Sequence, residues 1–245
     1  MRVLLLRPRA QLRLRRRGGA SYNAHMVPPT RVALIFDMDN TLIGSRIDFA
    51  GIRRSLIALL RAAGATDDSD EALLRRAIPE LVACGSAHDG VHGTVVAPEM
   101  WRIIEAHELD GLRDAAALDD APAVLRTLAS RGYRIAILTN NARAAATEAI
   151  RAADLAHCAE TVVARGDVAT LKPAGDGVRE VIRRLGGVDR AYVIGDSWVD
   201  GAAAAATGAR FIAYRRPLED LRHRGVLPWQ TIHHLSEMLE LNLTD

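Results

Sequence analysis

The sequence contains few aromatic residues, only two cysteines and no long apolar run. Aromatic residues make up 4% of the 245 positions, although 49% hydrophobic and 25% charged residues are ordinary for a soluble globular protein. Cys84 and Cys158 lack the spacing of a metal or redox motif, so no disulfide framework is expected and a reducing cytoplasm is the default location. No apolar segment approaches the roughly 20 residues of a membrane span, and we therefore expect no membrane partner.

Lysine is also nearly absent, because the chain holds 31 arginines and a single lysine, Lys172. Arginine and lysine are not interchangeable where a compact ammonium group is needed. Lys172 is therefore a candidate functional residue, and the alternative is that its retention is chance.

The basic residues are unevenly distributed along the chain. Residues 1–29 hold seven arginines and no acid, whereas residues 30–245 carry 25 basic and 30 acidic side chains. This mildly acidic remainder argues against a nucleic-acid partner for the folded core. We expect residues 1–29 to be a disordered or non-native extension, because so polar a segment buries too little apolar surface to offset its ordering entropy. A transit peptide and a basic arm for an anionic partner are the alternatives.

One apolar stretch ends in two closely spaced carboxylates. Residues 32–36 read V-A-L-I-F and lead directly into Asp37 and Asp39. The uninterrupted apolar run predicts a buried strand of a parallel sheet, and ligands of open α/β sheets bind beyond the carboxyl ends of such strands. Two neighbouring buried acids need a cation, and magnesium prefers oxygen ligands. A solvated turn after the strand is the alternative interpretation.

Residues 44–118 contain no strand-like apolar run and predict a small helical domain inserted after the first strand. Apolar side chains recur at helical spacing over residues 49–60. His88, Asp89 and His92 lie close together in this block. We expect them in an exposed glycine-rich loop rather than in a second metal site.

From about residue 119 the pattern changes to strands that alternate with helices. The expected strands cover residues 134–138, 161–164, 191–194 and 210–214. This alternation favours a parallel sheet with helices on both faces. We therefore predict a Rossmann-like α/β core from residues 30–43 and 119–245, with residues 44–118 as an inserted α-helical cap.

Polar side chains follow three of the predicted strands, and Lys172 lies in a loop between the last two of them. They are Asp37 and Asp39 after the first strand, Thr139 and Asn140 after the second, and Asp196 and Asp200 after the strand at 191–194. Because the carboxyl ends of parallel strands meet at one edge of a sheet, these side chains are expected to converge.

The chemistry of this set is that of phosphoryl transfer. Asp37 and Asp196 can hold magnesium, and Asp200 can support the waters of the ion. We expect Thr139 and Asn140 to begin a helix, so that a hydroxyl, an amide and free backbone N–H groups form a phosphate site. Lys172 would offset the repulsion between a nucleophilic carboxylate and a phosphate.

These motifs and their order resemble the haloacid dehalogenase superfamily of phosphohydrolases. The matching segments are D-M-D-N-T-L at 37–42, L-T-N at 138–140, K-P at 172–173 and G-D-S-W-V-D at 195–200. The helical insert between the first two motifs is similar to that of the phosphoglycolate phosphatase-like branch. One departure is Asn40, which stands where that family frequently has glycine.

The resemblance implies a role for each matching residue. Asp37 would be the nucleophile and Asp39 the general acid and base, while Thr139 and Lys172 would bind the phosphoryl group. Magnesium would be bound by Asp37, the backbone carbonyl of Asp39, and Asp196.

The expected function is Mg²⁺-dependent hydrolysis of a small phosphate monoester through an aspartyl-phosphate. A phosphomutase of the same branch and a non-catalytic phosphate-ligand binding protein are the alternatives. The expected partner is a small phosphorylated metabolite, bound by a monomer or homodimer.

Overall fold

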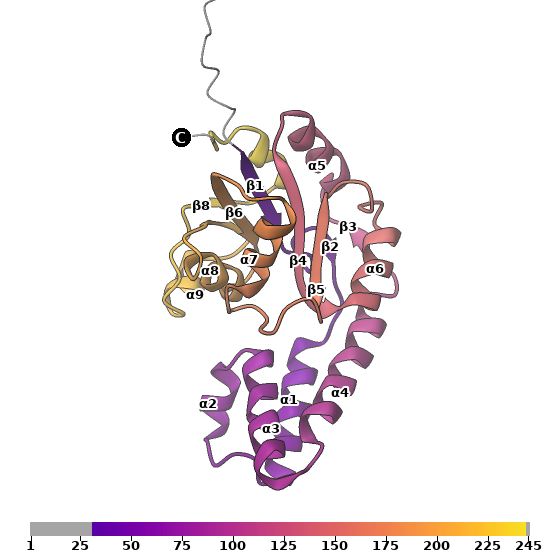
Figure 1. Cartoon of the computed structure of the whole chain (residues 1–245), viewed down its shortest axis with the longest axis vertical. Helices are drawn as coiled ribbons and strands as arrows, with labels where there is room; N and C mark the ends of the chain where they lie inside the picture. Colours follow the sequence, from indigo (N-terminus) through magenta and orange to yellow (C-terminus); the bar gives the residue numbers. More distant parts are fainter. Residues whose placement is uncertain (1–30, 244–245) are drawn as a thin grey trace, which may run out of the picture.

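The computed structural model describes residues 31–243, which form an α/β core and a helical insert (Figure 1). The expectation for residues 1–29 lies outside this range. A six-stranded sheet in the order β5-β4-β1-β6-β7-β8 forms the centre of the core, and every neighbouring pair of its strands is parallel. The strands are β1 (Val32–Phe36), β4 (Arg134–Ala142), β5 (Thr161–Arg165), β6 (Arg190–Gly195), β7 (Arg210–Tyr214) and β8 (Gln230–Ile232).

The first strand lies inside the sheet because its apolar side chains are covered on both faces. Every residue of β1 is buried, and no side chain from Val32 to Phe36 is more than 1% exposed. Val32, Leu34 and Phe36 face one hydrophobic cluster, whereas Ala33 and Ile35 face the other. The strand pairs with β4 on one side and β6 on the other, so its carboxyl end opens at the middle of the sheet.

Helices cover both faces of the sheet, which confirms the predicted fold class. On one face lie α5 (Ala121–Ser130), α6 (Arg143–Ala152) and the 3₁₀ segment Leu235–Leu239. On the other face lie α7 (Asp176–Arg184) and α8 (Trp198–Ala205), followed by the short α9 (Leu218–Arg222). Each alternate residue of β1 therefore contacts a different helical layer.

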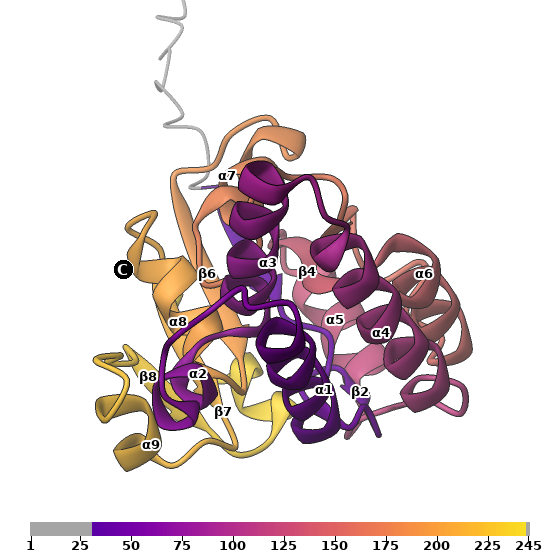
Figure 2. The ribbon, with the colours of Figure 1, turned by 90° about the horizontal axis from the view of Figure 1, so that it is seen from below.

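The helical insert consists of α1 (Phe49–Ala62), α2 (Asp70–Arg75), α3 (Ile78–His92) and α4 (Val96–Gly111). Seen from below, these helices lie across the end of the core (Figure 2). A two-stranded antiparallel sheet, β2 (Ile43–Gly44) with β3 (Ala116–Ala117), joins the two connections between insert and core. No helix within residues 31–243 has the length and apolar character that crossing a bilayer requires.

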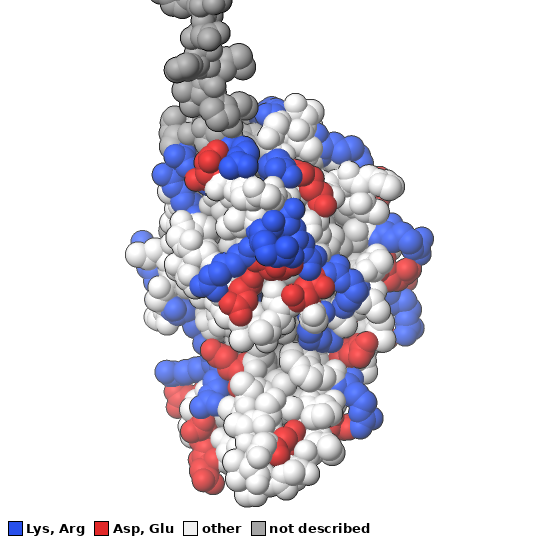
Figure 3. Space-filling view, viewed as in Figure 1, with Lys and Arg blue, Asp and Glu red and all other residues white. Residues whose placement is uncertain are grey.

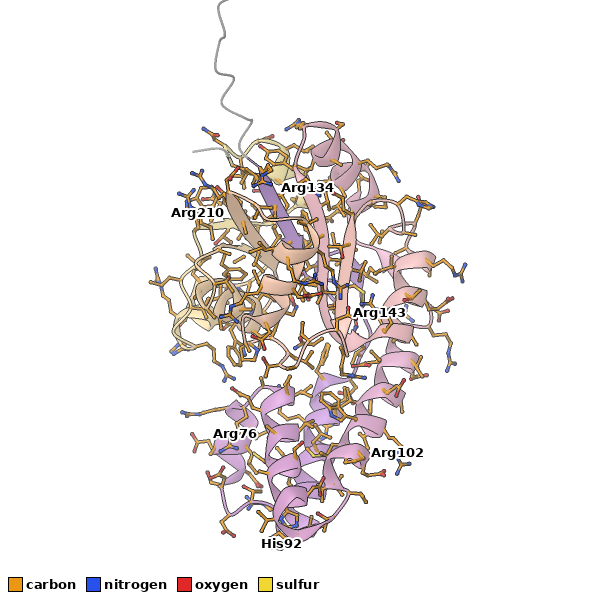
Figure 4. All side chains as sticks on the ribbon, viewed as in Figure 1. Arg76, His92, Arg102, Arg134, Arg143 and Arg210 are labelled. Atoms are coloured by element: carbon orange, nitrogen blue, oxygen red, sulfur yellow. The ribbon has the colours of Figure 1, made fainter. Side chains whose placement is uncertain are left out.

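The expectation of an exposed loop at residues 88–92 is wrong. His88, Asp89 and His92 belong to the last turns of α3 rather than to a loop, and His92 lies at the end of the insert far from the sheet (Figure 4). The Asp89 carboxylate accepts hydrogen bonds from the N–H groups of Val96 and Ala97 at 2.8 Å each, so it caps the first turn of α4. Asp89 therefore has a structural role at the start of α4, which the glycine-rich sequence around it did not indicate.

Candidate active site

The carboxyl ends of β1, β4 and β6 bring the predicted polar residues together, as expected for parallel strands. Asp37 directly follows β1, and its N–H donates to the Ile194 carbonyl of β6 at 2.8 Å, so the strand ladder continues into the site. Asp37 and Asp39 are 7% and 9% exposed, and Asp200 is 1% exposed. These carboxylates therefore lie at the floor of the crevice rather than in a solvated turn.

Lys172 links the acids from its buried position in the loop after β5. Its Nζ lies 2.5 Å from Asp37 Oδ1 and 2.7 Å from Asp200 Oδ1, and it also donates to the Leu138 carbonyl at 3.1 Å. The three ammonium donors are thereby used. Burial alone would lower the lysine pKa, but the charges of Asp200 and Asp37 raise it above its usual value. The group stays cationic, and it contacts Asp200 directly.

Thr139 and Asn140 do not begin a helix, because β4 continues to Ala142 and α6 starts at Arg143. The Asn140 side chain instead holds the main chain of Lys172. Its Oδ1 accepts from the Lys172 N–H at 3.0 Å, and its Nδ2 donates to the Lys172 carbonyl at 2.9 Å. Thr139 is buried, and its hydroxyl oxygen accepts from the Asn141 N–H at 3.1 Å. Asn140 thus positions the lysine.

The turn after Asp39 explains the asparagine at position 40. Asn40 has a φ of 56°, in the left-handed region that glycine adopts freely and asparagine tolerates better than most residues. Before this turn, Asp39 Oδ2 accepts a hydrogen bond from Asn141 Nδ2 at 2.6 Å, and Asp39 Oδ1 is buried without a partner among the described residues. The departure at position 40 therefore preserves the turn, and Asn141 is a site residue that the sequence did not reveal.

Burial and mutual repulsion raise the pKa values of three acids in the site. Burial, then the charge of Asp37, raises the pKa of Asp39 to about 7. Burial together with Asp37 and Asp200 raises the pKa of Asp196 to about 8. For Asp200, burial outweighs the stabilising effect of Lys172, and its pKa rises to about 6. One lysine is therefore too little positive charge for four carboxyl groups.

The acid cluster fits a divalent cation. Oxygen atoms of Asp37, Asp196 and Asp200 lie within 4.8 Å of one another. Hard carboxylate oxygens are the ligands that magnesium prefers, and a cation would remove the repulsion that raises the pKa values. Gly195 contributes by its lack of a side chain, since a Cβ there would lie 2.4 Å from the Asp200 Cγ.

Adding Mg²⁺ to the metal-free protein is expected to raise its unfolding temperature. A ligand at one hundred times its dissociation constant stabilises the folded state by about 2.7 kcal/mol. Asp196→Asn should lose most of this gain, while its metal-free form should be at least as stable as the wild type because one repelling carboxylate is gone. Scanning calorimetry at several Mg²⁺ concentrations measures both effects, with the exposed Asp110→Asn as control. Equal gains in wild type and Asp196→Asn would contradict this site.

The core and the insert enclose a cleft of about 500 Å³ above the acids, within the range of small-molecule sites. The core contributes polar groups to the lining of this cleft, namely Asp37, Asp39, Asn141, Lys172 and Asp196. The insert contributes largely apolar side chains, namely Phe49, Ile52, Ile78, Trp101 and Ile104. On the face shown in Figure 3, acidic and basic side chains are interspersed over the core and the edges of the insert. The cluster of acids around Lys172 therefore lies inside the cleft and not on this face.

A buried ion pair joins the insert to the core beside this cleft. Glu108 of α4 is 3% exposed and accepts two hydrogen bonds from the Arg165 guanidinium of β5, at 2.7 and 2.9 Å. Glu108 also accepts from the Ala142 N–H at 3.1 Å, and Arg165 stacks on the ring of Trp101. This contact spans 57 residues of sequence, and no local pattern could have revealed it.

Comparison with known proteins yields consistent matches. The family model described as haloacid dehalogenase-like hydrolase matches residues 32–208. A phosphoglycolate phosphatase of Cereibacter sphaeroides is 30% identical over 206 residues, covering 79% of this chain and 91% of that protein. A phosphoglycolate phosphatase of Rhodospirillum rubrum is 32% identical over 190 residues, covering 72% and 76%.

Solved structures match the fold. A putative haloacid dehalogenase-like hydrolase from Bacteroides fragilis gives a TM-score of 0.62 at 22% identity, over 85% of this chain and 99% of that one. A hydrolase from Pseudomonas syringae gives 0.64 at 20% identity, over 85% and 96%.

Proposed function

The chain belongs to the haloacid dehalogenase-like hydrolase family, and on that premise we propose that it is a Mg²⁺-dependent phosphatase of a small phosphate monoester. The observation that carries the proposal is the second acid. Asp39 is buried beside the candidate nucleophile, is held by Asn141, and has a pKa raised to about 7. Binding a phosphate does not need such a group, whereas general acid and base catalysis does.

In the proposed reaction Asp37 is the nucleophile. Its carboxylate oxygen attacks phosphorus and forms an aspartyl-phosphate, while Asp39 gives its proton to the departing alkoxide. Asp39, now ionised, then takes a proton from the water that attacks the aspartyl-phosphate, which releases inorganic phosphate and restores Asp37. A pKa near neutrality suits Asp39 to both transfers.

The other residues would bind and orient the reacting groups. Lys172 holds Asp37 in place and supplies positive charge toward the phosphoryl oxygens, and Thr139 is the proposed phosphoryl-binding hydroxyl. Asp37, Asp196 and the carbonyl of Asp39 would hold Mg²⁺, with Asp200 behind them. The bound ion would neutralise the charge of the transferring phosphoryl group.

The helical insert is the proposed cap, over residues 44–118. Because its apolar side chains face the acids across the cleft, its approach to the core would exclude water from the reacting phosphate. The relatives' names suggest phosphoglycolate as the first substrate to test.

The test is release of inorganic phosphate by the full chain from phosphoglycolate and a panel of phosphomonoesters, with Mg²⁺ and with a chelator. We expect release that requires Mg²⁺. Conversion of a hexose 1-phosphate to its isomer without phosphate release would indicate a mutase instead. Neither release nor isomerisation of any ester would contradict catalysis altogether.

A further inference from the structure

Two arginines from different parts of the fold meet at the wall of the cleft. Arg53 belongs to α1 of the insert, Arg224 follows α9 of the core, and both line the cleft. Arg53 Nη1 donates to the carbonyl of Arg76, and Arg224 Nη1 donates to the carbonyl of Arg75. Because these carbonyls belong to consecutive residues at the end of α2, the two guanidinium groups lie near each other, and the charge of Arg224 acts on Arg53.

The pair differs from the other arginines of the cleft in its lack of acidic partners. Four arginines line the cleft; Arg165 pairs with Glu108, and Arg216 pairs with Asp220. Within residues 31–243, neither Arg53 nor Arg224 forms an ion pair. Partial burial and the charge of Arg224 lower the pKa of Arg53, although Glu80 acts in the opposite direction. Arg53 is half-buried and Arg224 is exposed. The half-buried Arg53 lies beside a second cation without an anionic partner, so an anion bound between the two groups would relieve their repulsion.

Glu80 is near Arg53, but it forms no ion pair with either arginine of the cleft wall, and part of its carboxylate is used at the start of α3. Its Oε2 accepts from the Ala77 N–H at 2.6 Å. Each guanidinium has five N–H donors, and one carbonyl occupies only part of this capacity. The Arg224 guanidinium also lies 5.1 Å from the centre of the Trp198 ring, and both residues line the same cleft as Asp196.

We propose that Arg53 and Arg224 together bind a second anionic group of the substrate, a carboxylate or a second phosphate, while its ester phosphate lies against Asp37. This rests on the proposed phosphatase function and names its substrate class: small phosphomonoesters with a further negative charge. Two guanidinium groups offer the paired donors that such groups accept. Because one arginine belongs to the insert and the other to the core, this ligand also joins the two across the cleft.

Three phosphate esters with the same two-carbon backbone test the proposal. They are phosphoglycolate, ethylene glycol bisphosphate and the neutral-ended 2-hydroxyethyl phosphate, assayed with wild type, Arg53→Gln and Arg224→Gln. Wild type should prefer one of the two esters that carry a second anionic group, and the identity of that ester shows whether the group is a carboxylate or a phosphate. In each variant kcat/KM for that ester should fall about 10- to 100-fold, mainly through KM, as expected for a lost charged hydrogen bond. Turnover of 2-hydroxyethyl phosphate should change by less than about twofold.

The controls are Arg54→Gln and Arg222→Gln, which remove the same charge from exposed neighbours outside the cleft. Both should behave like wild type with every ester. Equal losses of all three esters in Arg53→Gln and Arg224→Gln would show that the arginines only cap α2, and would overturn the proposal. So would a wild type without preference for a second charge.

A second experiment tests the arginine pair even if the protein is not a phosphatase. If wild type releases phosphate from no ester, calorimetric titration with phosphoglycolate and ethylene glycol bisphosphate still tests the arginine pair. Tighter binding to wild type than to Arg53→Gln and Arg224→Gln would support the pair without catalysis. Equal affinities, or no binding of either compound to wild type, would overturn it.

Discussion

Asp37→Asn is expected to abolish phosphate release, with a loss of kcat on the order of 10³-fold or more. The amide has almost the shape of the carboxylate but lacks its nucleophilic oxygen, so the aspartyl-phosphate cannot form. Initial rates with the best ester of the panel measure the loss. Asp110→Asn, an exposed aspartate of α4 that pairs with Arg113, is the matched control and should keep full activity. Full activity in Asp37→Asn would rule out Asp37 as the nucleophile.

The same variant should remain folded, which separates chemistry from structure. The charge of Asp37 raises the pKa values of Asp39, Asp196 and Asp200. Its removal relieves that repulsion, although it also takes one acceptor from Lys172. We expect a melting temperature near that of wild type without metal, and a smaller increase on adding Mg²⁺.

Lys172→Met is expected to destabilise the protein by about 3–5 kcal/mol, the usual cost of leaving buried charges without their partner. Methionine has a similar length but cannot donate to Asp37, Asp200 or the Leu138 carbonyl. Urea unfolding at pH 8 without metal measures the difference. A loss below about 1 kcal/mol would mean that the lysine is not what holds the acids together.

The stability lost in Lys172→Met is expected to be smaller at low pH than at high pH. Lys172 lowers the pKa values of Asp39, Asp196 and Asp200, so without the lysine these values rise further above those of the unfolded chain. The folded variant then binds protons that the unfolded chain does not bind until lower pH, so its deficit shrinks as the pH falls from 8 toward 5. Lys172→Arg keeps the charge but has a planar, larger head group, and it should recover only part of the stability.

The sequence predicted the core because its signals are local and mutually consistent. Uninterrupted apolar runs marked β1 and β6, and parallel pairing then placed the residues after them at one edge. Lys172 was found by its rarity, and it does contact two of the acids. The roles of these residues in catalysis stay predictions.

The sequence-based predictions failed where a residue's position depends on a partner far away in the sequence. β4 extends past Asn140 because Ala142 pairs with Arg165 of β5, and the Asn140 side chain binds the main chain of Lys172, 32 residues away. Asn141 was missed because its partner Asp39 lies 102 residues away. The pairing of Glu108 with Arg165 and the convergence of Arg53 with Arg224 likewise depend on how the insert docks on the core. Residue spacing carries no information on such contacts.

The solitary lysine also makes the site spectroscopically distinct. In a protein grown with ¹⁵N-labelled lysine, one side-chain ammonium resonance would arise, and it would come from Lys172 alone. That group is 3% exposed and hydrogen-bonded to two carboxylates and a carbonyl, which slows its exchange with water. The chemical shift of this one nucleus would then report, in the unaltered chain, each change in the charge of Asp37 and Asp200 as metal or phosphate binds.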